Sequence, residues 1–403
     1  MPLNHEERLN KKKIKVIEIF SFLTGFAQAV MAYILSSYFK ESLGTENFGI
    51  YYSVAYILVL VSLLNFHKIL KKFGKSDVFF ATFLAKIIIL AFLATVAPSF
   101  FGAILLVLYI FMGSVNAVSL DSILESFSVD GKSGRIRGMH LMILDAGFLL
   151  GPILSTQLLE GFNFQVVFVA SLIIDSAALL FMSFGLGKIN EKFRQRETII
   201  NLLKKAFKRK NIMRIYYISF VCEFFYTLMI IYTPIYLLDL GVTWEKIGII
   251  FTIMLIPFVV LPYPAGFLAD KKWGEKKLLI AAIFIMGVST FYIYFIHSTE
   301  IWIWALAMFA TRIGASLIQT LRDSYFYKRI DGKDVDLIDF FRTAMPVAYI
   351  LAPAVSVVAL LFFPLKVMFL IVGIVVLSAL YPAFRLVNNH CEADLSRTFK
   401  KNS

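Results

Sequence analysis

The residues best placed to do chemistry in this sequence are charged side chains inside long apolar segments. Glu223 lies about ten residues from one end of such a segment, and Arg312 about fifteen from the matching end of another. At ~1.5 Å per residue the depths differ by roughly 7 Å, which two long side chains can bridge. We expect Glu223 and Arg312 to pair. Protonation of Glu223 or an anionic substrate at Arg312 would loosen the pair, unless it is a static link between helices.

Other charged groups occur in similar apolar surroundings. Lys86 and Asp175 lie at comparable depth, and we expect them to form a structural ion pair. Asp145 suits either a proton carrier or a partner for a nearby base. Asp121 and Glu125, four residues apart, share one helix face near its end, which favours a gate or a solvated rim.

Uncharged polar groups also interrupt the apolar segments. They are Thr24, Gln28, Asn116, Tyr226, Tyr232 and Gln319. Each suits either a contact with substrate or a hydrogen bond between helices. The five histidines are scattered without metal-ligand spacing, and the two cysteines form no Cys/His cluster. The sequence therefore indicates no metal, no cofactor and no enzyme active site.

The elements that must position these residues are membrane spans. The chain has 403 residues, of which 59% are hydrophobic and only 17% charged, and its mean hydropathy is +0.77. A soluble protein carries about 25% charged residues. Twelve apolar runs are each long enough to cross roughly 30 Å of hydrocarbon as a helix. We expect them at 15–38, 47–66, 77–97, 101–127, 139–159, 164–187, 213–238, 245–267, 277–296, 301–327, 337–361 and 366–387.

The basic residues are distributed unevenly between the loops. Of 40 Lys and Arg residues, 33 lie at the N-terminus, in the loops after the even-numbered spans, in the C-terminal tail, or at the span ends that adjoin these segments. The opposite loops and the span ends that adjoin them contain only Lys40, Lys246 and Lys366. This positive-inside bias predicts a multi-pass protein of the inner or plasma membrane with both termini in the cytoplasm. The net charge of +13 therefore needs no nucleic-acid partner. The polar N-terminus does not suit a cleaved signal peptide.

The loop between the eighth and ninth spans carries the most specific motif. It reads Gly266-Phe-Leu-Ala-Asp270-Lys271-Lys-Trp-Gly274-Glu-Lys276-Lys, a tight cationic turn. It resembles the signature G-x-L-A-D-(R/K)-x-G-(R/K)-(K/R) of the major facilitator superfamily (MFS). The resemblance implies an all-α membrane protein with twelve transmembrane helices in two pseudo-symmetric six-helix bundles.

The resemblance also implies a gating role for Asp270. In the family this acid faces a base at the inner end of a neighbouring helix and the start of a helix in the other half. In this sequence the corresponding positions are Arg322, which precedes Asp323, and the start of span five near Gly138. The first-half copy of the loop has lost its acid, because Leu70 stands where Asp270 stands in the second half.

An internal repeat divides the chain. Gly44 corresponds to Gly241, Gly74 to Gly274 and Asp121 to Asp323, at offsets of 197 to 202 residues. We expect an N-terminal bundle over 1–187, a basic cytoplasmic linker over 188–212 and a C-terminal bundle with a short tail over 213–403. The linker suits either an amphipathic helix on the cytoplasmic face or a solvated segment without such a helix.

The fifth span contains Gly147-Phe-Leu-Leu-Gly151-Pro152. This resembles part of the fifth-helix motif of the drug/proton antiporter branch, although Ser155 and Thr156 replace its last glycines. Close helix packing by small residues explains the pattern equally well.

Together these features predict a secondary active transporter that works as a monomer by alternating access. We expect proton-coupled efflux of an amphipathic small molecule. The alternatives are uptake of a nutrient or organic anion, and a non-transporting sensor or scaffold of the same fold.

Overall fold

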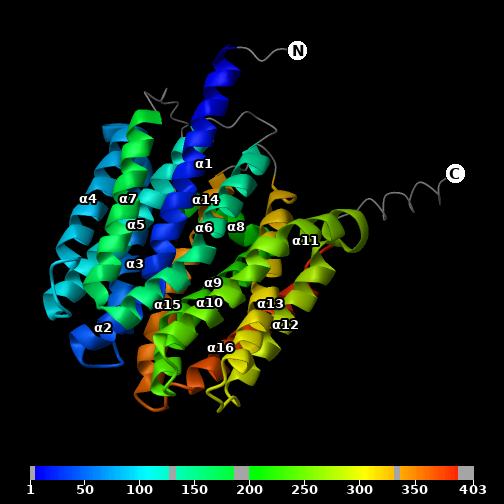
Figure 1. Ribbon diagram of the computed structural model, residues 1–403. Helices are drawn as coiled ribbons and strands as arrows, with labels where there is room; N and C mark the ends of the chain where they lie inside the picture. The colour runs from blue at the N-terminus through cyan, green and yellow to red at the C-terminus, as the bar shows by residue number, and fades with distance from the viewer. Residues whose placement is uncertain (1–4, 127–132, 186–198, 331–335, 389–403) are drawn as a thin grey trace. The chain divides into compact units, whose positions relative to one another are not determined.

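The described elements of this protein are all helices. The computed structural model describes residues 5–126, 133–185, 199–330 and 336–388 (Figure 1). In hydrocarbon, every backbone N–H and C=O must find a partner within the protein, and a helix satisfies them locally. The apolar composition of the chain therefore determines this architecture.

Eleven of the described segments are long and apolar enough to cross a membrane. The longest, Trp244–Ile293, has 50 residues and contains both the eighth and the ninth expected spans. A single straight helix of that length would be ~75 Å long, more than twice the thickness of the hydrocarbon core. The segment turns at Gly274, whose φ of 73° lies outside the helical range, so the expected twelve-span fold agrees with the structure.

The chain divides into two compact units, each described here by itself. Unit 1 contains Met1–Gln195 and Thr243–Thr252, and unit 2 contains Arg196–Val242 and Ile253–Ser403. Part of the expected linker, residues 188–198, lies outside the described residues. The rest of it includes a short helix, α8 (Ile199–Lys208), which buries Leu202 and Ala206 and exposes Phe207.

Unit 1 consists of the first seven helices and the start of the tenth. They are α1 (His5–Ala32), α2 (Leu35–Leu43), α3 (Gly49–Phe73), α4 (Lys75–Leu93), α5 (Phe100–Ser126), α6 (Ser133–Gly161) and α7 (Phe164–Gly185). Phe20, Phe79 and Phe83 pack together in its core, with ring centroids 5.2–6.0 Å apart.

Unit 2 contains α8 and the remaining helices. They are α9 (Lys210–Asp239), the second part of α10 (Trp244–Val260), α11 (Pro262–Leu268), the π-helical turn η1 (Ala269–Trp273), α12 (Gly274–Ile293), α13 (Ile301–Tyr327), α14 (Asp336–Arg342), α15 (Ala344–Leu360), α16 (Val367–Ser378) and α17 (Leu380–Phe384).

The two units repeat the same packing pattern. In unit 1, α1 packs against α6 and α7, while α4 packs against α5 and α7. In unit 2, α9 packs against α15 and α16, while α12 packs against α13 and α16. Helices at equivalent positions in the two halves therefore have equivalent neighbours, as the sequence repeat predicts.

Glycines at equivalent positions end helices in both units. Among the described residues, positive φ angles occur only at Gly44, Gly74, Gly241 and Gly274, at 62°, 88°, 83° and 73°. They form the two repeat-related pairs Gly44/Gly241 and Gly74/Gly274. Other residues rarely adopt a positive φ, so each of these turns needs glycine. In unit 1, Gly74 still forms the turn although Leu70 replaces the acid of the loop.

Candidate functional site

A polar cluster joins α9 and α13 inside unit 2. Glu223 Oε1 lies 2.7 Å from Arg322 Nη2, and both residues are buried. The Arg322 Nη1 group also donates to the backbone carbonyl of Ser219 at 3.3 Å, and its Nε lies 3.5 Å from Asp323 Oδ1. A guanidinium held by one carboxylate, a second carboxylate and a carbonyl is stabilised as a charge in low dielectric.

A second contact fixes the register of these two helices. The Tyr226 hydroxyl donates to Gln319 Oε1 at 3.2 Å, three residues along each helix from the ion pair. The helices are thus antiparallel, with Glu223 opposite Arg322. In the described part of the chain the ion-pair partner of Glu223 is Arg322, so the expected pairing with Arg312 is wrong. Arg312 is ten residues from Arg322, about 15 Å along the helix axis, a distance that counting from approximate span ends did not resolve.

Arg312 lies in an aromatic environment on the same helix. It is 2% exposed, and its guanidinium carbon lies 4.9 Å from the ring centroid of Phe225 and 6.0 Å from that of Tyr226. These are cation–π distances, and such contacts strengthen when water is excluded. This region of unit 2 therefore contains a cation, Arg312, next to the aromatic faces of Phe225 and Tyr226 and the Tyr226 hydroxyl.

The charged loop forms a separate ion network at the C-terminal end of α13. Lys328 Nζ lies 2.6 Å from Asp270 Oδ1 and 2.5 Å from Glu275 Oε1, and Ser324 Oγ donates to Glu275 at 3.0 Å. Burial lowers the pKa of Lys328, but the hydrogen bonds and charges of Asp270 and Glu275 outweigh it and raise that pKa overall.

This network corrects the expected partner of Asp270. The base is Lys328, not Arg322, because Arg322 lies nearly two turns earlier on α13 and pairs with Glu223. The proposed contact with the start of span five near Gly138 involves the other unit and stays a prediction.

The remaining residues of the loop motif differ in their surroundings. Lys271 lies 4.7 Å from the Phe267 ring centroid, and Lys276 is half-buried. Gly274 supplies the turn, whereas a Cβ added at Gly266 would meet nothing within 4 Å. The positive φ of Gly274 therefore explains that glycine, whereas the space around Gly266 does not require one.

In unit 1 the structure brings Lys86 and Asp175 together. Lys86 Nζ on α4 lies 2.8 Å from Asp175 Oδ2 on α7, with side chains 2% and 0% exposed. The ammonium also lies 5.3 Å from the Phe83 ring centroid and 5.4 Å from that of Tyr109. The pair thus ties two helices together within the membrane segment.

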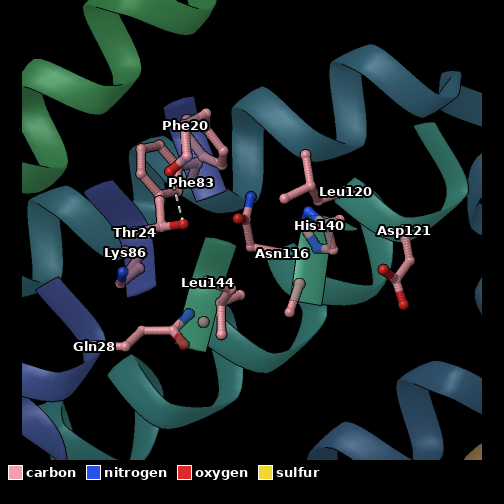
Figure 2. Close-up of a pocket in the computed structure, with 12 residues that line it drawn as sticks. Phe20, Thr24, Gln28, Phe83, Lys86, Asn116, Leu120, Asp121, His140 and Leu144 are labelled. Atoms are coloured by element: carbon pink, nitrogen blue, oxygen red, sulfur yellow. Dashed lines mark hydrogen bonds between the residues drawn. The ribbon is translucent and has the colours of Figure 1, made fainter. Parts of the chain in front are cut away.

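A small cavity opens beside Lys86. Its volume is about 140 Å³, and residues of α1, α4, α5 and α6 line it (Figure 2). The polar groups at its wall are Thr24, Gln28, Lys86, Asn116, Asp121 and His140. Asn116 uses its amide to bridge helices, donating to the Phe79 carbonyl at 2.9 Å and to Thr82 Oγ1 at 3.2 Å. The side chain of Glu125, the expected neighbour of Asp121, lies outside the described residues.

The fifth-span glycines allow α6 to approach α1 closely. A Cβ added at Gly147 would overlap the carbonyl oxygen of Phe22, and one at Gly151 would overlap Ala29. Pro152 lies inside α6, and its carbonyl accepts a hydrogen bond from Thr156 Oγ1 at 2.7 Å. These contacts explain the small residues by packing. Asp145, on the same helix, is half-buried, and its role stays a prediction.

A protein-family model matches nearly the whole chain. The model described as Major Facilitator Superfamily matches residues 17–321 and, in a second match, residues 239–401. The chain belongs to the major facilitator superfamily. It is therefore a multi-pass membrane protein and a secondary transporter of small molecules, not an enzyme.

Solved structures of MFS transporters share this fold. One is the POT family transporter PepTSo, with a TM-score of 0.75 and 12% identity over 97% of this chain and 99% of that chain. Another is the nucleoside transporter NupG, with a TM-score of 0.71 and 14% identity over 93% of this chain and 98% of that one; a variant of NupG gives 0.73. No curated protein matches this chain in sequence. At these identities, the likeness shows the MFS fold alone.

Two residues of this MFS transporter were not singled out from the sequence. Lys328 is the first base after α13. Its position directly beyond the end of that span could have marked it as a partner for Asp270. His140 was set aside as one of five scattered histidines. Only the structure shows that its Nδ1 lies 2.7 Å from Ser21 Oγ on α1.

Proposed function

We propose that this MFS transporter exports an amphipathic small molecule in exchange for protons by alternating access, with Glu223 as a proton acceptor. The observation that carries the proposal is the buried Glu223–Arg322 ion pair, 2.7 Å long, between α9 and α13. Uptake of one proton by Glu223 removes the nearer of the two carboxylate charges that compensate Arg322 and leaves only Asp323, 3.5 Å away. The cation is then less well compensated in low dielectric, which favours a conformation that offers it another partner.

The surroundings of Arg312 support an amphipathic substrate. Phe225 and Tyr226 present aromatic faces next to a buried cation, and the Tyr226 hydroxyl adds a polar group. A solute with an apolar body and one polar end can use both kinds of contact. The partial resemblance of Gly147, Gly151 and Pro152 to the drug/proton antiporter motif points in the same direction.

The test is collapse of a preset pH gradient in everted membrane vesicles that contain the protein. We expect cationic amphiphiles to collapse the gradient with the wild type and not with Glu223→Gln. Glu245→Gln is the matched control, because Glu245 is an exposed acid at the start of α10. Unchanged proton flux in Glu223→Gln, at equal expression, would remove Glu223 from the coupling.

Uptake of an organic anion is the second candidate, and the buried Arg312 favours it. A guanidinium at 2% exposure in the middle of α13 would attract a carboxylate or phosphate. In the same vesicles, a response to organic anions that is lost in Arg312→Gln and retained in Glu223→Gln would favour this function over the first.

We also propose that the protein acts as a monomer in the cell membrane with both termini in the cytoplasm. The chain offers a natural reporter, since Cys222 is buried and Cys391 lies in the C-terminal tail. An impermeant thiol reagent should label inverted vesicles and leave intact cells unlabelled. Labelling of intact cells at Cys391, lost in Cys391→Ser, would reverse the orientation.

A further inference from the structure

We propose that His140 is a proton-binding site of unit 1, taking up its proton on Nε2 from the cavity shown in Figure 2. The proposal adds a second titrating group to the proton coupling proposed above. It rests on that function for its consequence in transport. The protonation itself can be measured without any substrate.

The first step of the argument is the hydrogen bond that fixes the ring. Ser21 Oγ donates its single hydrogen to the Ile17 carbonyl at 2.6 Å. Toward His140 Nδ1, 2.7 Å away, the same oxygen can then only accept. Nδ1 therefore carries a hydrogen in both charge states. The neutral ring has its lone pair on Nε2, which is where a further proton must bind.

The second step is access. His140 is 5% exposed, yet it lines a cavity with Thr24, Gln28 and Asn116 at its wall. A cavity of about 140 Å³ with polar walls exceeds what one water molecule needs and provides it with partners. Water in this cavity would connect His140 with the polar groups along α5, from Asn116 to Asp121, which are roughly 7.5 Å apart along the axis.

The third step is the charge around the ring. From α5, the carboxylate of Asp121 lines the same cavity and favours the imidazolium form of His140. From α4, Lys86 disfavours it, but Asp175 on α7 lies 2.8 Å from Lys86 and offsets that charge. The groups that α1 adds to the wall, Phe20, Thr24 and Gln28, are neutral. Histidine is also the side chain that ordinarily changes charge between about pH 5 and 8.

The experiment is nitrogen-15 NMR of the full-length protein in lipid nanodiscs, with labelled histidine and no substrate. His140→Gln should remove one of the five histidine signal sets. In the wild type that set should show Nδ1–H alone at high pH and both N–H groups at low pH. A set that does not titrate between about pH 5 and 8, or whose neutral form carries its hydrogen on Nε2, would overturn the proposal.

Two neighbouring variants test the mechanism. Ser21→Ala should remove the preference for Nδ1–H, and Asp121→Asn should shift the titration midpoint to lower pH. An unchanged midpoint would overturn the role assigned to Asp121. His297→Gln, an exposed histidine of unit 2, should leave the His140 signals unchanged. If His140→Gln does not fold, replacing the other four histidines one at a time assigns the same signals.

Transport measurements on two variants distinguish a failure of this proposal from a failure of the proposed function on which it rests. Glu223→Gln should stop proton-coupled flux and leave the His140 titration intact. His140→Gln should retain flux but lose part of its dependence on pH between about 5 and 8. If His140 titrates and the pH profile of flux in His140→Gln matches the wild type, the group has no part in coupling, and that part of the proposal fails.

Discussion

Glu223 and Arg322 lie opposite each other on the antiparallel helices α9 and α13, with Oε1 2.7 Å from Nη2. Arg312, ten residues earlier on α13, packs on the Phe225 ring instead. The two cations of this helix therefore have different surroundings: Arg322 compensates an acid, and Arg312 lies against aromatic rings. Their mutational effects should differ accordingly.

The buried Glu223–Arg322 pair should show strong thermodynamic coupling. Glu223→Gln leaves Arg322 without its nearest carboxylate, and we expect a loss of about 3–5 kcal/mol in the free energy of unfolding. The double variant Glu223→Gln/Arg322→Gln should lose less than the sum of the single variants, because neither charge then remains. Chemical unfolding in detergent micelles measures the free energy of unfolding of the wild type, the two single variants and the double variant. Additive losses would show that the pair contributes no coupling energy.

The Lys86–Asp175 pair should behave as a structural link. Lys86→Met alone leaves a carboxylate at 0% exposure and should destabilise unit 1 by about 3–5 kcal/mol. Lys86→Met/Asp175→Leu replaces both charges with apolar groups and should recover most of that loss while retaining transport. A stable double variant that no longer transports would contradict the structural assignment.

The close contact of α1 and α6 should be sensitive to one methyl group. Gly151→Ala places a Cβ against Ala29, and we expect a loss of about 1–3 kcal/mol from overpacking. Gly161→Ala is the matched control on the same helix, since its Cβ would meet nothing within 4 Å. The measurement is the thermal unfolding midpoint of each purified variant. Equal midpoints for the two would rule out the packing explanation of the fifth-span glycines.

The Lys328 network predicts a loss of stability at alkaline pH. The pKa of Lys328 is raised above its ordinary value of 10.5 by Asp270 and Glu275, despite the opposing effect of burial. Its stabilising contribution is complete below the ordinary value and disappears as pH rises through the raised one. Stability should therefore be flat near neutral pH and fall in the wild type at strongly alkaline pH.

Lys328→Met is the comparison for this pH profile. It should be less stable near neutral pH and lack the alkaline component that depends on Lys328. Lys328→Arg keeps the charge and should extend the flat region to higher pH. Thermal unfolding midpoints across a pH series provide the measurement, and identical profiles for the wild type and Lys328→Met would contradict the prediction.

Much of the fold could be predicted from local patterns. Long apolar runs must be helices in hydrocarbon, so the spans follow from composition. The repeat located Gly44, Gly74, Gly241 and Gly274, and these are the described residues with positive φ. The expected Lys86–Asp175 pair needed only similar depth on two spans, because two isolated charges in lipid have few other partners.

The candidate site was less predictable, because it depends on how helices are aligned. Patterns in the sequence predict the membrane fold, its two related halves, the charged loop and the short set of intramembrane charges. Helix packing, which the sequence does not reveal, brings Glu223 to Arg322, Asp270 to Lys328, and His140 to Ser21, 119 residues away. A helix advances ~1.5 Å per residue, so an uncertainty of a few residues in a span end exceeds the length of a hydrogen bond. Partner choice is therefore fixed by the register and rotation of packed helices.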